Sequence, residues 1–109
     1  MGPEHPDLAM SLNNLGWLLL LQGKYDEAEP LHRRALAIRE KVLGPEHPEV
    51  AASLNNVARD LSARGEYGEA EPLFLRAATI MEKARDPRAA RVRENLAALY
   101  RARLSLSAR

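Results

Sequence analysis

The sequence predicts an all-α solenoid of two full helical hairpins followed by one final helix. Two observations support this fold class: a segment repeats, and within each copy apolar residues recur every three or four positions, as on one face of an α-helix. Gly-Pro-Glu-His-Pro at residues 2–6 returns at residues 44–48, so the repeat is 42 residues long. We therefore expect one domain in which neighbouring hairpins stack against each other.

The repetition extends well beyond this opening motif. Ser-Leu-Asn-Asn at residues 11–14 returns at 53–56, and Glu-Ala-Glu-Pro-Leu at 27–31 returns at 69–73. A third, partial copy begins near Pro87 after a shorter linker. The single domain, residues 1–109, then divides into a first repeat at 2–43, a second at 44–85 and a partial third at 86–104.

The first repeat is expected to form two helices, at residues 6–22 and 25–43. Pro6 fits the first turn of a helix, where a missing N–H costs nothing, and Gly23 suits the left-handed backbone at a helix end. Acidic residues in the first turn of the second helix suit the helix dipole, and Pro30 predicts a slight kink. The apolar positions are Leu8, Leu12, Leu15 and Leu19 in the first helix and Leu31, Ala35, Ile38 and Val42 in the second.

The other helices follow the same pattern and are expected at residues 48–64, 67–85 and 87–104. Pro48 and Pro87 again fit first helical turns. Their apolar positions include Val50, Leu54, Val57 and Leu61 in the third helix and Ala89, Val92, Leu96, Leu99 and Tyr100 in the last.

Composition excludes several classes of protein. The chain has no cysteine, so it has neither a disulfide framework nor a cysteine-ligated metal. Its aromatic content of 5% is too low for a stacking platform on nucleic acid, and its net charge of +1 indicates no partner by itself. The longest apolar run, residues 17–21, is far shorter than the roughly 20 residues that cross a bilayer, and no signal peptide is evident. We expect a cytoplasmic protein with no nucleic-acid or membrane partner.

The residue pattern does not predict an enzyme. His5 and His47 precede prolines at equivalent places, so we expect them at helix entries, and His32 occupies a packed position. Ser11 and Ser53 have no histidine and aspartate arranged to activate them. We expect no catalytic residue, no metal and no cofactor.

The turn Gly-x-Tyr-x-x-Ala, at residues 23–28 and 65–70, resembles the turn of the tetratricopeptide repeat (TPR). Glu40 and Glu82 replace the closing proline of that repeat, so the second helix can extend and the period lengthens to 42. In this the sequence resembles the kinesin-light-chain type of TPR. Signature positions are occupied by Leu12, Leu15, Gly16, Leu19, Ala28, His32 and Ala35 in the first copy and by Leu54, Val57, Ala58, Leu61, Ala70, Phe74 and Ala77 in the second.

The resemblance implies a TPR-like superhelix for protein–protein interaction, whose concave face, lined by the first helix of each pair, binds an extended peptide. Asn14, Asn56 and Asn95 are carried over to this face, where a ladder of amides could hold a peptide backbone. Alternatively, these asparagines bond neighbouring helices and set the repeat spacing. Arginine favours carboxylates, so an acidic peptide is the expected ligand. The other expected binding residues are Asn13, Trp17, Asn55, Arg59 and Arg91, and Arg101 is expected to lie near them.

A second hypothesis is a structural module that assembles with itself through the ends of the solenoid. Residues 17–21 are apolar on every side of their helix, whereas the second copy has Arg59 and Ser62 at corresponding places. Solenoid ends without polar caps favour association. The candidate residues for a homo-oligomer are Trp17, Leu20, Leu21, Leu99 and Leu104.

Overall fold

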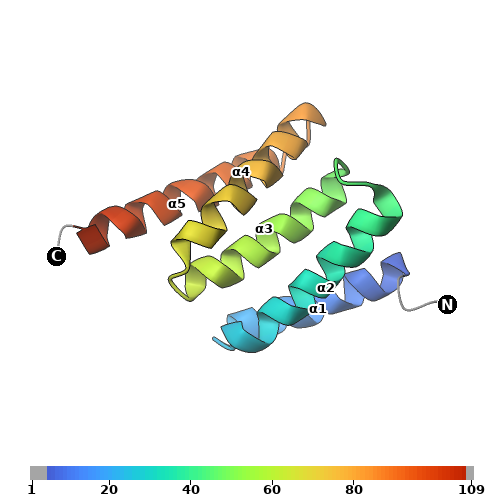
Figure 1. Ribbon diagram of the computed structural model, residues 1–109, viewed down its shortest axis with the longest axis horizontal. Helices are drawn as coiled ribbons and strands as arrows, with labels where there is room; N and C mark the ends of the chain where they lie inside the picture. Colours follow the sequence, from blue (N-terminus) through green and yellow to red (C-terminus); the bar gives the residue numbers. More distant parts are fainter. Residues whose placement is uncertain (1–4, 108–109) are drawn as a thin grey trace.

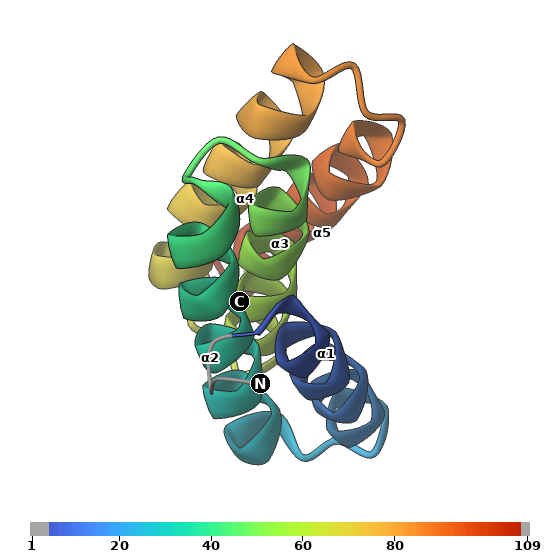
Figure 2. The same ribbon diagram turned by 90° about the vertical axis from the view of Figure 1, so that its right-hand side faces the viewer.

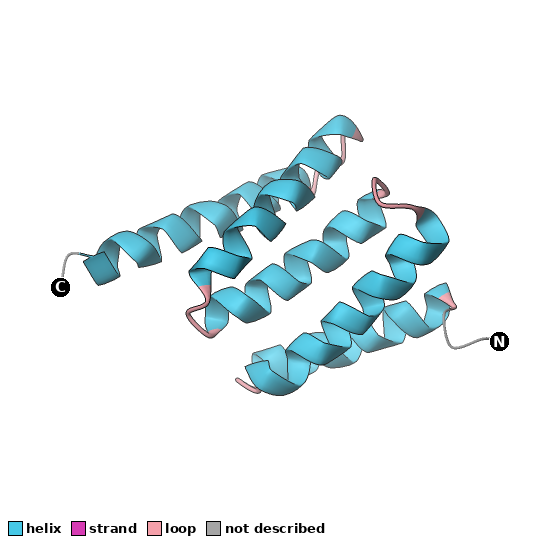
Figure 3. Ribbon diagram, viewed as in Figure 1, coloured by secondary structure: helices cyan, strands magenta, loops and turns pink. Residues whose placement is uncertain are grey.

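The computed structural model describes residues 5–107, which form five helices joined by short loops (Figures 1 and 3). This confirms the predicted all-α fold. The helices are α1 (Pro6–Leu21), α2 (Tyr25–Leu43), α3 (Pro48–Ala63), α4 (Tyr67–Lys83) and α5 (Ala89–Ser107). The largest difference from the expected bounds concerns α5, which begins two residues later and continues to Ser107. Its start is delayed because residues 87–88 form a turn, in which the Arg88 amide donates to the Asp86 carboxylate at 2.9 Å.

Two of the helices begin directly after a histidine whose side chain caps the first turn. The Nδ1 atom of His5 accepts a hydrogen bond from the Asp7 amide, and that of His47 accepts one from the Glu49 amide, each at 3.0 Å. These bonds satisfy amides that have no partner within the helix, while the following proline removes another such donor. The expectation that both histidines lie at helix entries is confirmed.

The helices pack in two rows along the solenoid. In Figure 2, α2 and α4 lie on one side and α1, α3 and α5 on the other. Each helix packs against the next along the chain, and α3 also contacts both α1 and α5, whereas the backbones of α1 and α5 do not come close to each other. Helix α3 is therefore the centre of the described structure, and both outer parts depend on it for their position.

The close packing within a hairpin depends on small residues. A Cβ atom added to Gly16 would lie 2.5 Å from Nε2 of His32, so the imidazole ring occupies the space that a larger residue would fill. Ala58 at the equivalent place in α3 is also fully buried. The helices can approach closely because these positions carry almost no side chain.

The core is larger in the second half of the chain than in the first. The larger cluster joins α3, α4 and α5, and a smaller one joins α1 and α2 around Ala9, Leu12, Ala35 and Ile38. Three predicted apolar positions are not buried, because Leu15 is 49%, Val42 is 47% and Tyr100 is 39% exposed. Val57, at the position equivalent to Leu15, is fully buried. Among the described residues, no helix covers the side of α1 that corresponds to the side of α3 facing α2.

Candidate peptide-binding groove

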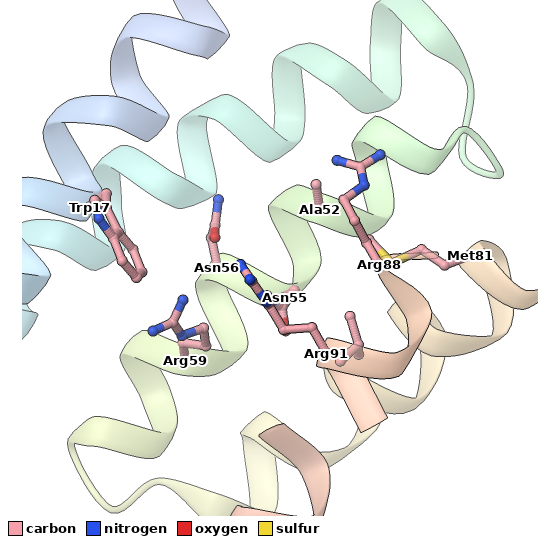
Figure 4. Close-up of a pocket in the computed structure, with 9 residues that line it drawn as sticks. Trp17, Ala52, Asn55, Asn56, Arg59, Met81, Arg88 and Arg91 are labelled. Carbon is pink, nitrogen blue, oxygen red and sulfur yellow. The ribbon is translucent and has the colours of Figure 1, made fainter. Parts of the chain in front are cut away.

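A cavity of about 260 Å³ opens between α1, α3 and α5 (Figure 4). Trp17 lies at one side of it and Arg91 at the other, with Asn56 and Arg59 of α3 between them. The structure thus brings together five of the eight residues expected to bind a peptide. The complete lining is Trp17, Ala52, Asn55, Asn56, Arg59, Met81, Arg88, Arg91 and Val92.

Trp17 and Arg59 occupy equivalent positions in successive repeats and meet across the groove. The guanidinium carbon of Arg59 lies 4.3 Å from the centroid of the Trp17 ring. Cation–π attraction favours this arrangement, in which the indole supports the arginine from one side. Trp17 is therefore half-buried within the groove rather than at an open end of the solenoid.

The groove carries positive charge without a carboxylate among the residues that line it. Arg88 is already paired, with Asp86 at 2.8 Å and with Glu49 at 2.9 Å. In contrast, Arg59 and Arg91 form no salt bridge with any residue of the described range 5–107. Burial lowers the pKa of Arg59, and the nearby charge of Arg91 lowers it further. The two arginines repel each other, so an anion placed between them would be attracted by both.

The asparagines do not form the ladder considered from the sequence. The amide nitrogen of Asn95 donates to the amide oxygen of Asn55 at 3.1 Å, so it bonds to the first asparagine of the second pair rather than to Asn56. Asn13 is buried, and its amide oxygen, turned towards α2, accepts from Arg39 at 2.7 Å. These contacts fit the alternative interpretation, in which asparagines join neighbouring helices. Adjacent residues point about 100° apart on a helix, so Asn56 faces the groove while Asn14 is exposed.

The residues expected to drive self-association lie in different environments. Leu99 is only 1% exposed, in the apolar cluster that includes α4, so its side chain does not lie on the surface. Leu20 is partly buried, while Leu21 and Leu104 are 66% and 69% exposed. The structure also exposes Leu18 on α1, which the sequence analysis did not select. Its spacing from Leu15 and Leu21 could have revealed it, because residues three apart share a helix face.

Four lining residues of the groove were not predicted from the sequence. Ala52, Met81 and Val92 form apolar parts of its wall, and Arg88 adds a further cation. Arg88 follows Pro87 at the expected start of the last helix, so its position in the repeat was the signal that could have identified it. The others are ordinary apolar residues, which no sequence feature distinguishes from core.

Within residues 5–107, no group of three or more histidine, aspartate or glutamate side chains is arranged to hold a metal ion. None of the helices in the same range has both the length and the hydrophobicity needed to cross a membrane.

Comparison with known proteins identifies the repeat. A model of the tetratricopeptide repeat family matches residues 1–41 and 19–83. The fold is similar to a crystal structure of nearly identical TPR-like repeats of a kinesin light chain from Podosopora anserina, with a TM-score of 0.80 and 29% identity. A crystal structure of a substituted form of that protein matches with a TM-score of 0.79 and 29% identity. Both alignments cover 94% of this chain and 50% of the other, so the chain spans half the length of these relatives.

None of the curated proteins compared with the chain matches it. The family model nevertheless covers well over half of the residues, and the solved structures share the fold. The chain therefore belongs to the tetratricopeptide repeat family, in the form found in kinesin light chains.

Proposed function

We propose that the chain is a protein-interaction module that binds an extended, acidic peptide in the groove between α1, α3 and α5. TPR folds generally mediate protein–protein interaction. The observation that carries the finer proposal is the pair Arg59 and Arg91, which line one cavity that contains no carboxylate. A glutamate or aspartate of the peptide supplies the missing anion, and a guanidinium can bind it through two parallel hydrogen bonds.

The remaining lining residues suit the other parts of such a peptide. Asn56 offers both an amide donor and an amide acceptor, so it can bond to a peptide backbone irrespective of sequence. Ala52, Met81 and Val92 provide an apolar surface for an aliphatic side chain. Because Asn13, Asn55 and Asn95 already bond within the protein, they support the groove and leave Asn56 as the principal amide for the ligand.

The test compares peptides and arginine variants in one binding assay. A fluorescently labelled library of acidic peptides is measured beside a matched library in which every glutamate and aspartate is replaced by its amide. We expect the acidic library to contain binders, and Arg91→Gln to weaken them about tenfold, a loss of roughly 1.4 kcal/mol. Arg101→Gln is the matched control, because Arg101 is exposed on the same helix outside the cavity. Equal binding of both libraries, or equal losses in both variants, would contradict the proposal.

One observation favours a second function, self-association through α1. Met10, Leu15, Leu18 and Leu21 are all at least 49% exposed on this helix. At the positions equivalent to Leu15 and Leu18, Val57 and Asp60 of α3 and Leu96 and Leu99 of α5 are all buried. In this second proposal the open side of α1 packs against the same side of α1 in a second copy, which removes both apolar surfaces from water.

Sedimentation velocity over a range of protein concentrations tests this association. We expect a dimer that Leu18→Glu dissociates, because a charge in the centre of an apolar contact would be buried without a partner. Leu104→Glu, on the exposed part of α5, is the control and leaves the dimer intact. A monomer at all concentrations, or equal effects of the two variants, would exclude association through α1.

A further inference from the structure

The ring of His32 lies between two oxygen atoms where three helices meet. On one side, Nδ1 contacts the carboxyl oxygen Oδ2 of Asp60 on α3. On the other side, Nε2 lies 3.4 Å from the backbone oxygen of Asn13 on α1. The side chains of His32 and Asp60 are both completely buried. Bulk solvent therefore does not reach these groups, so hydrogen bonds between them must satisfy their polar atoms.

These contacts determine how many protons the pair holds. A backbone carbonyl only accepts hydrogen bonds, so Nε2 must carry a hydrogen to bond with Asn13. In a neutral imidazole the other nitrogen, Nδ1, then has no hydrogen. The contact between Nδ1 and Asp60 consequently needs one more proton, either on the carboxyl group or on the ring. The pair satisfies both sides only when it holds this additional proton.

The environment of Asp60 supports the same proton count. Its second oxygen, Oδ1, is buried without a hydrogen-bond partner, a costly position for part of an ionised carboxylate. Burial raises the pKa of Asp60, while the hydrogen bond from His32 opposes that rise. Two other charges act on the group: Glu29 of α2 raises its pKa further, and Arg59 of α3 lowers it. Helix α1 contributes only the Asn13 carbonyl, because its one charged residue, Asp7, lies in the first turn.

We propose that packing of the α1–α2 hairpin on α3 takes up one proton at the His32–Asp60 pair and that pH near neutrality thereby controls the strength of this junction. In the unfolded chain the separated imidazole releases its proton near pH ~6.5. Between about pH 4 and 6.5 both states hold one proton, so this contribution is constant. Above that range the folded state holds more protons than the unfolded state, and stability falls as pH rises.

The junction also determines the shape of the groove. Trp17 belongs to the hairpin and Arg59 to α3, so their 4.3 Å contact spans the same boundary as the His32–Asp60 pair. Loss of the proton weakens the packing that holds Trp17 over Arg59. This consequence for ligand binding rests on the proposed function, whereas proton uptake is measured without any peptide. Failure of either proposal is therefore distinguishable from failure of the other.

The second junction, where the α3–α4 hairpin packs on α5, supplies the matched control. Phe74 and Leu99 stand at the positions equivalent to His32 and Asp60, and both lie in the apolar core. A variant with His32→Phe and Asp60→Leu therefore replaces a titrating pair with one that this fold already contains. Urea unfolding of this variant and the wild-type protein is measured from about pH 6 to pH 9, a range centred above the ordinary imidazole pKa. The fluorescence of Trp17, the only tryptophan, follows the transition.

Because all other titrating groups are common to both proteins, the ratio of their folding constants isolates the pair. We expect this ratio to change up to tenfold per pH unit above about pH 6.5, in the direction that weakens the wild-type protein. A ratio that stays constant across the range would overturn the proposal.

Nitrogen NMR of the wild-type imidazoles tests the proton count without relying on the folding of a variant. At neutral pH we expect a hydrogen on Nε2 of His32 together with a second hydrogen in the contact between Nδ1 and Asp60. A neutral ring with its hydrogen on Nδ1 and a bare Nε2 would overturn the proposal.

Discussion

The two junctions between repeats use the same positions for opposite chemistry. At the first junction, His32 contacts Asp60, and Arg39 donates to Ser53 at 3.0 Å. At the second junction, Phe74, Leu99, Met81 and Val92 occupy the equivalent positions, and all four are buried in one apolar cluster. A polar residue on one helix thus faces a polar residue on the next, and an apolar residue faces an apolar one. The backbone arrangement accepts either kind, provided that both sides of the junction match.

Loss of the Phe74 side chain should lower the free energy of unfolding most. Phe74→Ala removes the ring from the second junction and leaves a cavity between α4 and the helices beside it. We expect the free energy of unfolding to fall by about 3–5 kcal/mol, as measured by urea denaturation. Leu75→Ala is the control, because Leu75 is exposed on the same helix. Similar losses in the two variants would show that the junction does not depend on Phe74.

Removing one member of the polar pair should cost somewhat less. Asp60→Leu leaves Nδ1 of His32 buried without a partner, and we expect a loss of about 3 kcal/mol. Addition of His32→Phe should recover most of this loss, because the first junction then carries the pair found at the second. A double-mutant cycle measures the coupling between the two positions. If the two losses of unfolding free energy simply add, the two positions are not coupled and need not match.

The space around His32 provides a smaller test. Gly16→Ala places a methyl group 2.5 Å from Nε2, so the imidazole must shift away from the Asn13 carbonyl or from Asp60. We expect a loss of about 1–3 kcal/mol in thermal or urea unfolding. Ala58→Gly, the reverse change at the equivalent place, should cost only about 1 kcal/mol, through helix propensity. A harmless Gly16→Ala would show that the ring can move without penalty.

Substitutions in the turns that precede α3 and α5 should change the free energy of unfolding least. Gly44 ends α2 with φ of 91°, whereas Arg85 follows α4 with φ of 56°, a left-handed conformation that favours glycine. Arg85→Gly should therefore raise the free energy of unfolding by less than about 1 kcal/mol, since the flexibility of glycine offsets part of the relief. Gly44→Arg should instead lower it. Calorimetry on both variants measures the difference, and a stabilising Gly44→Arg would contradict this explanation.

The sequence was sufficient to predict the helices, because they depend on the repeat. It could not predict burial at each equivalent position. Leu15 and Val57 share a place in the repeat, but only Val57 has a neighbouring helix over it. Burial depends on what packs outside the repeat, and periodicity contains no information about that.

The matched pairs at the junctions were also missed. His32 and Asp60 are 28 residues apart, and neither lies in a motif that names the other. Comparison of the copies does contain a signal. Phe74 replaces His32 in the second copy, and Leu99 replaces Asp60 in the third. Recognition of that signal required knowledge of which residues meet across a junction. The orientation of Asn55 towards Asn95 rather than into solvent needed the same knowledge.

The distance between the backbones of α1 and α5 has a consequence for cooperativity. Each outer part is joined to the rest only through its neighbours, so the two ends of the unliganded protein can open independently. A peptide that reaches from Trp17 to Arg91 would link those ends for the first time. Hydrogen exchange at α1 and α5 would then slow together on binding, because a single event would have to release both.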